Sequence, residues 1–355
     1  MKYALIGCGR IAKNHVAAAI SNSQEIEIAA LCDTMPEHAQ RYIDEYGLKC
    51  PIYTDYRKLL EEIRPDFVAI ATESGKHAAI ALDCIKAGAN VLIEKPIALS
   101  VADAQAILEN AEAAGVTVGV CHQNRFNRAV QKLRSAIEEG RFGRIYNIAA
   151  VVRWNRDEGY YKQAPWRGTW AQDGGCLMNQ CIHNIDLLRW VGGEVESVTG
   201  TTKNFQHPYI EAEDFGTAIV RFKNGIIGTI EGTVNAYPHN LEETLTVLGE
   251  RGTVRLGGKS VNTIEVWEFA GQGDTLADIQ EEFSETPPNI YGFGHSPLYA
   301  DFIHAVQKKC APYITASDGK QAMDIVLAIY QSSMTGNAVS FPLADCSSLD
   351  FADVR

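Results

Sequence analysis

The sequence lacks long apolar runs and closely spaced cysteines. No uninterrupted apolar stretch approaches the roughly 18 residues of a membrane span, so we expect no membrane-spanning segment. The nine cysteines contain no CxxC pair, which argues against a zinc site and against a disulfide framework, and we expect no metal. Internal repeats and low-complexity segments are also missing.

Positive charge is scarce as well. The chain carries 32 Lys and Arg against 44 Asp and Glu, for a net charge of -12, which argues against a nucleic-acid or membrane-surface partner. An anionic substrate would therefore need locally placed arginines. The 355 residues, 46% of them hydrophobic, suffice for two domains. A strand that begins at Tyr3 leaves no room for a signal peptide, and the scattered cysteines suit a reducing compartment, so we expect a cytoplasmic protein.

A glycine-rich turn opens the chain. The apolar strand at 3–6 leads into Gly7-Cys8-Gly9-Arg10-Ile11-Ala12, and a helix is predicted over 11–20. This GxGxxA pattern is typical of dinucleotide-binding turns, in which Gly7 permits the tight turn and Gly9 lets a pyrophosphate approach the backbone. Arg10 and Ile11 would lie where the helix N-terminus faces the phosphates.

An acidic residue follows at the expected spacing. Asp33 ends the second predicted strand, 26 residues after Gly7, where a carboxylate binds the adenosine ribose. Because that carboxylate repels a 2′-phosphate, we predict NAD rather than NADP as the cofactor. The alternative is that Asp33 is an ordinary residue of a strand-end turn.

Strands and helices alternate through the first third of the chain, which predicts a doubly wound parallel sheet. Strands are expected at 67–71, 90–93 and 116–120, and polar residues follow each of them. These loops would gather at the carboxyl edge of the sheet, around the cofactor. We therefore expect five further cofactor contacts there: Thr72, His77, Glu94, Lys95 and Gln123.

The second half has a different pattern. A long strand is predicted over 144–153 and strands with short turns from 195 to 269, with Asn224-Gly225 as a hairpin signal, and helices at 295–308 and 318–334 close the chain. We predict an NAD-binding Rossmann domain over 1–122 and, over 123–355, an α+β domain with a large open, mostly antiparallel sheet. Whether the C-terminal helices pack back on the first domain is left open. The open sheet face suits a homo-oligomer, a dimer or tetramer.

The segment 166–186 is the richest in polar and aromatic residues. A helix is predicted over 174–190, and on it Asn179, His183 and Asp186 would share a face. A histidine with an amide one turn earlier suits a site that holds a hydroxyl and moves its proton. The alternative is a core histidine paired with Asp186.

Together, the GxGxxA turn with Asp33, the tripeptide Glu94-Lys95-Pro96 and the Asn179 to Asp186 segment resemble the Gfo/Idh/MocA oxidoreductase family over nearly the whole chain. The resemblance implies NAD(P)-dependent oxidation or reduction of a sugar or polyol hydroxyl. It also implies that Lys95 is the catalytic lysine and His183 the second acid/base residue. The alternative for Lys95 is a surface lysine that ends a strand. Several members have aspartate where this chain has Asn179, and an amide only orients substrate.

Within that family the chain is most similar to the branch that oxidises C3 of UDP-N-acetylglucosaminuronic acid in bacterial surface-polysaccharide pathways. Substrate contacts are accordingly expected from Arg125, Arg167, Tyr160 and Trp166, as well as Asn179. Arginine suits phosphate and carboxylate, and aromatic rings suit a uracil or sugar face. The alternative for these residues is contact with the cofactor pyrophosphate or with another subunit. Two other functions stay open: a dehydrogenase of a free sugar or polyol such as an inositol, and a non-catalytic NAD-binding sensor.

Overall fold

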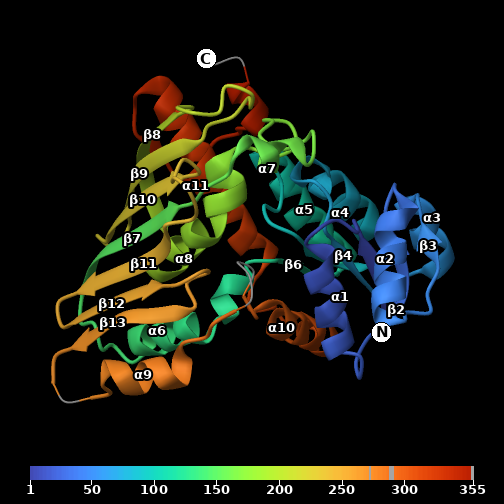
Figure 1. Ribbon diagram of the computed structural model, residues 1–355, viewed down its shortest axis with the longest axis horizontal. Helices are drawn as coiled ribbons and strands as arrows, with labels where there is room; N and C mark the ends of the chain where they lie inside the picture. The colour runs from blue at the N-terminus through green and yellow to red at the C-terminus, as the bar shows by residue number, and fades with distance from the viewer. Residues whose placement is uncertain (272, 288–291, 353–355) are drawn as a thin grey trace. The chain divides into compact units, whose positions relative to one another are not determined.

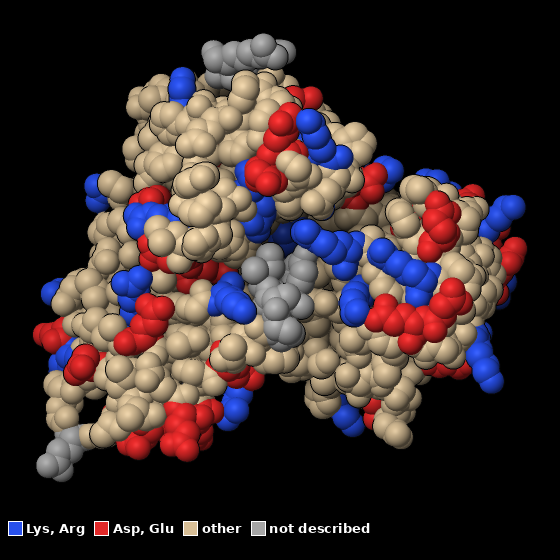
Figure 2. Space-filling view, in the orientation of Figure 1, with Lys and Arg blue, Asp and Glu red and all other residues tan. Residues whose placement is uncertain are grey.

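The structure is a computed structural model that describes residues 1–271, 273–287 and 292–352. It divides into two compact units. The first comprises Met1–His122 with His295–Lys320, and the second comprises Gln123–Gly294 with Gln321–Arg355. Among the described residues, no helix combines the length and apolar character needed to cross a bilayer. On the face drawn in Figure 2, basic and acidic side chains are interspersed.

The first unit is built on a parallel sheet of six strands in the order β3-β2-β1-β4-β5-β6 (Figure 1). Strand order reverses between β1 and β4, and ligands bind beside such a reversal in open α/β sheets. The central strands β4 and β5 are buried apart from Asn90 at the start of β5, which explains why they read as continuous apolar runs rather than as alternating ones. The strands are β1 (Lys2–Ile6), β2 (Glu27–Cys32), β3 (Ile52–Tyr53), β4 (Phe67–Ile70), β5 (Asn90–Ile93) and β6 (Val118–Val120).

Helices connect these strands. The N-cap predicted for one of them is present, since the Ser100 hydroxyl accepts a hydrogen bond from the Asp103 amide at 3.1 Å. A helix from near the C-terminus, α10 (His295–Lys308), belongs to this unit and packs against α1. The other helices are α1 (Ala12–Ser21), α2 (Pro36–Tyr46), α3 (Tyr56–Ile63), the 3₁₀ turn η1 (Ser74–Lys76), α4 (His77–Lys86) and α5 (Val101–Ala114).

The second unit is built on an eight-stranded sheet in the order β13-β12-β11-β7-β10-β9-β8-β14. All neighbouring strands are antiparallel apart from β7 and β10, which are parallel, so the predicted fold class is confirmed. The predicted hairpin joins β9 to β10, with Gly225 at a φ of 87°. The strands are β7 (Ile145–Arg153), β8 (Val195–Lys203), β9 (Phe215–Phe222), β10 (Ile227–Thr233), β11 (Glu242–Gly249), β12 (Gly252–Gly257), β13 (Thr263–Phe269) and β14 (Val339–Ser340).

One face of this sheet is covered by helix α8 (Ile182–Gly192), which packs on β7, β10 and β11. Strand β7 shows why, because Ile148, Ala150 and Val152 are buried while the residues between them are partly exposed. The remaining helical segments are η2 (Gln123–Phe126), α6 (Arg128–Glu138), α7 (Glu158–Lys162), η3 (Leu177–Cys181), α9 (Leu276–Phe283) and η4 (Ser348–Phe351). Helix α11 (Ala316–Thr335) begins in the first unit and continues into the second.

The single helix predicted over 174–190 was wrong in detail. A π-helical turn, η3, precedes α8, and the helix runs on to Gly192. A π turn changes the angular spacing of the side chains, so the regular four-residue spacing assumed between Asn179 and His183 does not apply. Such turns often mark functional sites.

Candidate active site

The glycine-rich turn follows β1 and has room for a dinucleotide. Gly7 has a φ of 93°, and a Cβ on it would lie 2.5 Å from the Ala71 carbonyl carbon, so no other residue fits there. A Cβ on Gly9 would meet no protein atom within 4 Å, which leaves the backbone open to a pyrophosphate. Helix α1 then begins without a side-chain cap, so its first amides are available to an anion. Beside this turn Arg10 is exposed and Ile11 is half-buried.

The Asp33 carboxylate supports this turn. It accepts hydrogen bonds from the backbone amides of Cys8 at 2.8 Å and Met35 at 2.9 Å. Since each carboxylate oxygen has two lone pairs, Asp33 keeps acceptor capacity for ribose hydroxyls, and that role stays a prediction.

Two residues of α2 that the sequence did not single out also hold the turn. The Arg41 guanidinium donates to the carbonyls of Cys8 and Gly9 at 2.8 Å each, and the Tyr42 hydroxyl donates to the Gly9 carbonyl at 2.7 Å. No sequence signal marks them, because their partners lie 32 or 33 residues away.

His77 joins the loops that follow β4 and β5. Its Nδ1 lies 2.7 Å from the Pro96 carbonyl oxygen and its Nε2 lies 3.1 Å from that of Thr72. The ring is buried, and this burial lowers the pKa of His77. A neutral imidazole has one N–H, so His77 donates to one of these two carbonyls while its other nitrogen lies against the second. We regard His77 as a support of the loops rather than a direct cofactor contact.

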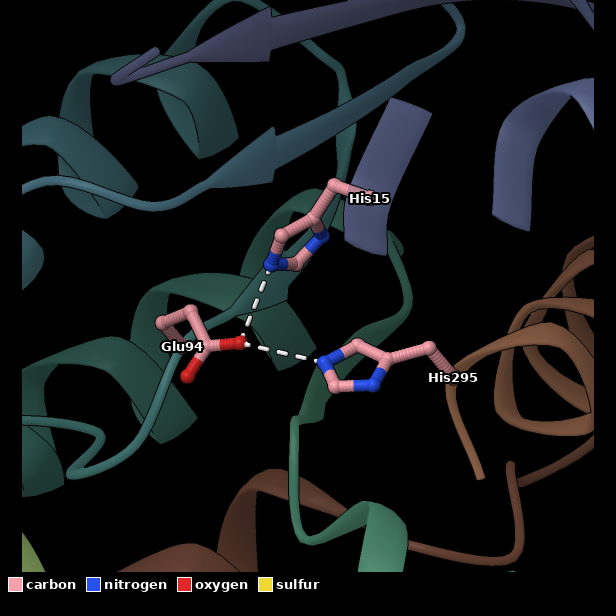
Figure 3. Close-up of side chains that lie close together, drawn as sticks. All are labelled: His15, Glu94 and His295. Carbon is pink, nitrogen blue, oxygen red and sulfur yellow. Dashed lines mark hydrogen bonds and ion pairs between the residues drawn. The ribbon is translucent and has the colours of Figure 1, made fainter. Parts of the chain in front are cut away.

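Glu94 and Lys95 directly follow β5 and have different surroundings. The Glu94 carboxylate is buried and accepts a hydrogen bond from His15 Nε2 at 3.0 Å, so it faces the core of the first unit (Figure 3). The Lys95 residue is half-buried. Of this pair we therefore keep only Lys95 as a residue for the reaction.

In the second unit, Asn179 lies in η3 and is held at both ends of its amide. Its Nδ2 donates to the Asp173 carboxylate, and its Oδ1 accepts from Gln180 Nε2 at 2.7 Å. Gln180 in turn donates to the Tyr160 hydroxyl at 2.9 Å. The side chain predicted to orient substrate is thus itself oriented by its neighbours.

His183 and Asp186 on α8 have different environments. His183 is half-buried, whereas Asp186 is fully buried and pairs with Arg125, whose Nε and Nη2 lie 2.7 and 2.5 Å from the two carboxylate oxygens. The alternative of a His183–Asp186 core pair loses its support, because both Asp186 oxygens serve Arg125. Arg125 also lies over the Trp190 ring, at 5.2 Å.

Substrate contact by Arg125 therefore finds no support in the structure. Its side chain is 1% exposed, and its charge is neutralised within the second unit. It fixes the loop η2 to α8. Its neighbour Gln123 is also buried, and the Gln123 side-chain oxygen has no hydrogen-bond partner among the described residues.

Two other arginines enclose a tyrosine. Arg156 and Arg167 lie 5.1 and 4.0 Å from the centre of the Tyr160 ring, and Arg167 also lies 5.6 Å from the Trp166 ring. Their hydrogen-bond acceptors are backbone carbonyls and side-chain amides: Tyr160, Gln163, Asn155, Gln180 and Asn240. No carboxylate among the described residues pairs with either guanidinium, so both charges remain available to an anionic ligand. We call Arg156, Tyr160 and Arg167 the arginine–tyrosine cluster.

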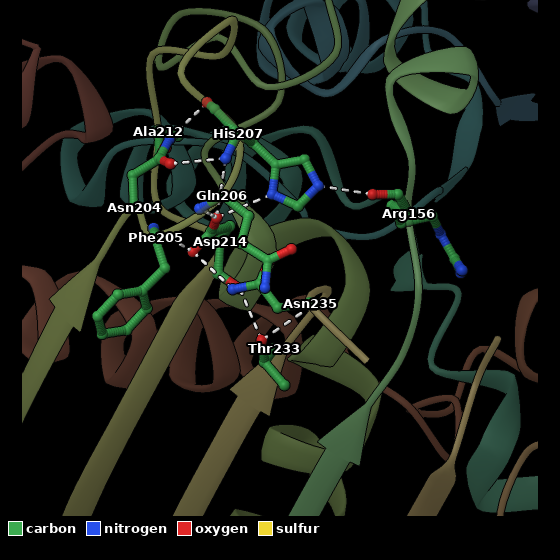
Figure 4. Close-up of polar contacts among 9 residues, drawn as sticks. All are labelled: Arg156, Asn204, Phe205, Gln206, His207, Ala212, Asp214, Thr233 and Asn235. Carbon is green, nitrogen blue, oxygen red and sulfur yellow. Dashed lines mark hydrogen bonds and ion pairs between the residues drawn. The ribbon is translucent and has the colours of Figure 1, made fainter. Parts of the chain in front are cut away.

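An ion pair between His207 and Asp214 supports this cluster through the backbone carbonyl of Arg156. His207 Nδ1 lies 2.8 Å from the Asp214 carboxylate, and His207 Nε2 lies 2.7 Å from the Arg156 carbonyl oxygen (Figure 4). Burial opposes both charges, but hydrogen bonding outweighs it: the pKa of Asp214 falls to about 2 and that of His207 rises. With a proton on each ring nitrogen, His207 satisfies both acceptors.

A buried carboxylic acid supports the start of η3. Glu213 Oε1 accepts hydrogen bonds from the Leu177 amide at 2.7 Å and from the Tyr330 hydroxyl at 2.9 Å. A Cβ on Gly175 would overlap this carboxyl group, which explains the second glycine of Gly174-Gly175. Burial raises the pKa of Glu213 to about 8, so the group is protonated at neutral pH.

Comparisons with known proteins agree with this geometry. Residues 1–122 match the family model "Oxidoreductase family, NAD-binding Rossmann fold", and residues 130–255 match the "GFO/IDH/MocA C-terminal domain". The chain is 39% identical to a WlbA dehydrogenase from Bordetella pertussis solved with NADH and UDP-GlcNAcA, with a TM-score of 0.90 over 97% of this chain and 98% of that one.

Two further relatives give the range of similarity. A WlbA dehydrogenase from Chromobacterium violaceum, solved with the same two ligands, is 36% identical, with a TM-score of 0.88 over 97% of this chain and 96% of that one. The myo-inositol 2-dehydrogenase of Thermotoga maritima is 26% identical over 91% of this chain and 93% of its own length.

Proposed function

Because the chain belongs to the Gfo/Idh/MocA oxidoreductase family, we propose that it is an NAD-dependent dehydrogenase of a nucleotide sugar, with C3 of UDP-N-acetylglucosaminuronate as the reacting carbon. The coarser statement, an NAD-dependent oxidoreductase of sugar or polyol hydroxyls, follows from the family and its relatives. The finer one draws on the two WlbA relatives that bind UDP-GlcNAcA.

The arginine–tyrosine cluster is the observation that carries the nucleotide-sugar proposal. A UDP-uronate presents a diphosphate, a carboxylate and a uracil, whereas a free sugar or inositol presents none of them. Two guanidinium groups without carboxylate partners suit the anionic groups, and the rings of Tyr160 and Trp166 suit stacking. In a chain of net charge -12, such local cations are what would attract an anion.

Bound NAD would supply the hydride acceptor, and the open space at Gly9 and the uncapped start of α1 fit its pyrophosphate. We propose that Lys95 and His183 hold and move the proton of the reacting hydroxyl. Asn179, fixed by Asp173 and Gln180, would orient the sugar. Replacing Lys95 or His183 by alanine should lower kcat strongly with little change in NAD affinity. Near-normal turnover in both variants would refute these roles.

The substrate class is tested with a panel of UDP-sugars, uronates, free sugars and polyols, with NAD reduction followed by absorbance. We expect turnover of UDP-uronates. The Arg167→Gln variant should raise KM for them by roughly tenfold or more, because it removes an anion contact. The matched control is Arg134→Gln, whose guanidinium pairs with Glu138 at 2.6 Å. Turnover of inositols with no response to UDP-sugars would favour the polyol alternative, and no NAD reduction by any compound would favour the sensor.

We also propose a homo-oligomer formed through the outer face of the eight-stranded sheet. Ile219 on β9 is 47% exposed, whereas its neighbours Ala218 and Val220 are buried, which leaves a large apolar side chain on that face. Light scattering after size exclusion should show a dimer or tetramer, and Ile219→Glu should shift it toward monomer. A monomeric wild type would refute the proposal.

A further inference from the structure

Three buried side chains from different segments meet in the first unit (Figure 3), and one of them, Glu94, directly precedes Lys95 in the sequence. His15 comes from α1, Glu94 from the end of β5, and His295 begins α10. The Glu94 Oε1 atom lies 3.0 Å from His15 Nε2 and 3.7 Å from His295 Nε2. All three side chains are less than 10% exposed. The sequence singled out only Glu94 of these three.

The hydrogen bonds determine where the protons lie. Burial opposes ionisation of Glu94, but the hydrogen bond from His15 and the nearby His295 ring, 3.7 Å away, outweigh it and hold the pKa of Glu94 well below its usual range. As Glu94 can then only accept, His15 Nε2 must carry the hydrogen. The Tyr299 hydroxyl lies 2.7 Å from His15 Nδ1 and 2.9 Å from the Tyr3 hydroxyl, and so extends the hydrogen-bonded chain.

The other Glu94 oxygen reaches the backbone of Lys95. Its Oε2 accepts the Lys95 backbone N–H at 3.1 Å, and one residue further on the Pro96 carbonyl oxygen is held by His77. The backbone is therefore fixed on both sides of the lysine. The buried negative charge of Glu94 also belongs to the residue that directly precedes Lys95 in the sequence.

We propose that His15 is a positioning residue that acts through the Glu94 carboxylate on both the placement and the charge of Lys95. The inference rests on the proposed function, in which Lys95 handles the proton of the hydroxyl. Among the described residues, the titratable groups that face Lys95 from the first unit include three: Glu94, His77 of α4 and Cys121 after β6. Burial lowers the pKa of His77 and raises that of Cys121, so of these three only Glu94 is charged at neutral pH.

The same side chains have the composition of a metal site, since one ligand atom from each lies within 4.8 Å of the other two. The direct hydrogen bond between His15 and Glu94 gives these two groups a partner without an ion, whereas neither nitrogen of His295 has a hydrogen-bond partner among the described residues. Metal analysis of the purified protein separates the two interpretations. A stoichiometric transition metal that is lost in the Glu94→Gln variant would overturn the positioning proposal.

The first test exploits the two nitrogens of His15. A glutamine amide can place an N–H near the former Nε2 position and still donate to Glu94, whereas an asparagine amide lies near the Nδ1 position and cannot. We expect His15→Gln to keep kcat within roughly threefold of the wild type and His15→Asn to lose roughly tenfold or more. NAD affinity should change little in either. Equal losses in both variants would show that His15 is merely structural.

The second test measures the charge on Lys95 without relying on turnover. Competitive amine labelling across a pH series, read by mass spectrometry of the Lys95 peptide, gives the pKa of its ammonium group. Because Glu94→Gln removes a neighbouring negative charge, the pKa of Lys95 should fall. The Glu138→Gln variant, in which the carboxylate lost is exposed, is the control.

These outcomes separate the two proposals. An unchanged Lys95 pKa in Glu94→Gln would overturn the inference about Glu94 whatever the activity. A shifted pKa together with near-normal turnover of Lys95→Ala would leave the network intact and refute the proposed role of Lys95.

Discussion

Glu213 should make the stability of the protein fall as pH rises toward 8. Its carboxyl group is fully buried in the second unit, where it accepts from the Leu177 amide and the Tyr330 hydroxyl. Burial raises its pKa from the ordinary 4.5 to about 8. The folded state therefore holds this proton at pH values where the unfolded chain has released it.

The size of this loss in folding stability follows from the pKa values of Glu213 in the folded and unfolded states. They differ by about 3.5 units, and each unit corresponds to about 1.4 kcal/mol. The stabilisation is fully present below pH 4.5 and is lost progressively as pH rises through 8. Above pH 8 the loss reaches about 5 kcal/mol, and at pH 7 it is already about 3 kcal/mol. Glutamine has nearly the same shape and no proton to lose, so Glu213→Gln should remove this pH dependence.

Urea unfolding of the wild type and Glu213→Gln at several values between pH 5 and 8.5 tests the prediction. The free-energy difference between the two proteins should shift in favour of the variant as pH rises. The Glu138→Gln variant controls for loss of an exposed carboxylate, since the Glu138 side chain is 61% exposed. Parallel curves for the wild type and Glu213→Gln would refute the argument that burial keeps Glu213 neutral.

Three further predictions concern the cofactor turn and the support of the arginine–tyrosine cluster. Gly7→Ala should abolish NAD binding in a calorimetric titration, because its Cβ would meet the backbone at Ala71 and Thr72; normal affinity would contradict this. Asp33→Ala should relax the preference for NAD over NADP, and unchanged discrimination in steady-state kinetics would rule out the ribose role. The pKa of His207 is raised, so its pairing with Asp214 stabilises the fold fully below about pH 6.5 and is lost as pH rises through the folded pKa. Thermal unfolding of His207→Gln should lack that decline, and an identical pH profile would argue against the ion pair.

Short-range patterns in the sequence were sufficient to predict most of the architecture. The parallel strands are apolar runs that end in polar loops, and the hairpin at Asn224-Gly225 is a local turn signal, so both follow from neighbouring residues. The parallel pairing of β7 with β10 was not predicted. It joins strands about 80 residues apart, and nothing local specifies such a partner. The π turn before α8 was not predicted either, because its residues have ordinary helical character.

Some site residues could likewise be predicted from local sequence, and others could not. The roles that the fingerprint assigns to Gly7 and Gly9 agree with the space around each of them. Arg41, Glu213 and His207 were missed, because each acts on a segment that the fold alone brings near. Burial also decides their charge, and a sequence does not show which carboxyl group is kept from water. Glu213 and Asp214 are adjacent, yet the pKa of the first rises to about 8 and that of the second falls to about 2.

The arginines show most clearly what the fold adds to the functional argument. From residue type alone, Arg125 and Arg167 were equal candidates for an anionic substrate. In the structure, the Asp186 carboxylate, 61 residues away in sequence, neutralises Arg125, whereas Arg167 binds a backbone carbonyl and an amide oxygen. A guanidinium that already has a carboxylate partner gains little from a phosphate, and one without such a partner gains much. The nucleotide-sugar proposal therefore depends on Arg156 and Arg167, and a substrate without an anionic group would leave their charges unexplained.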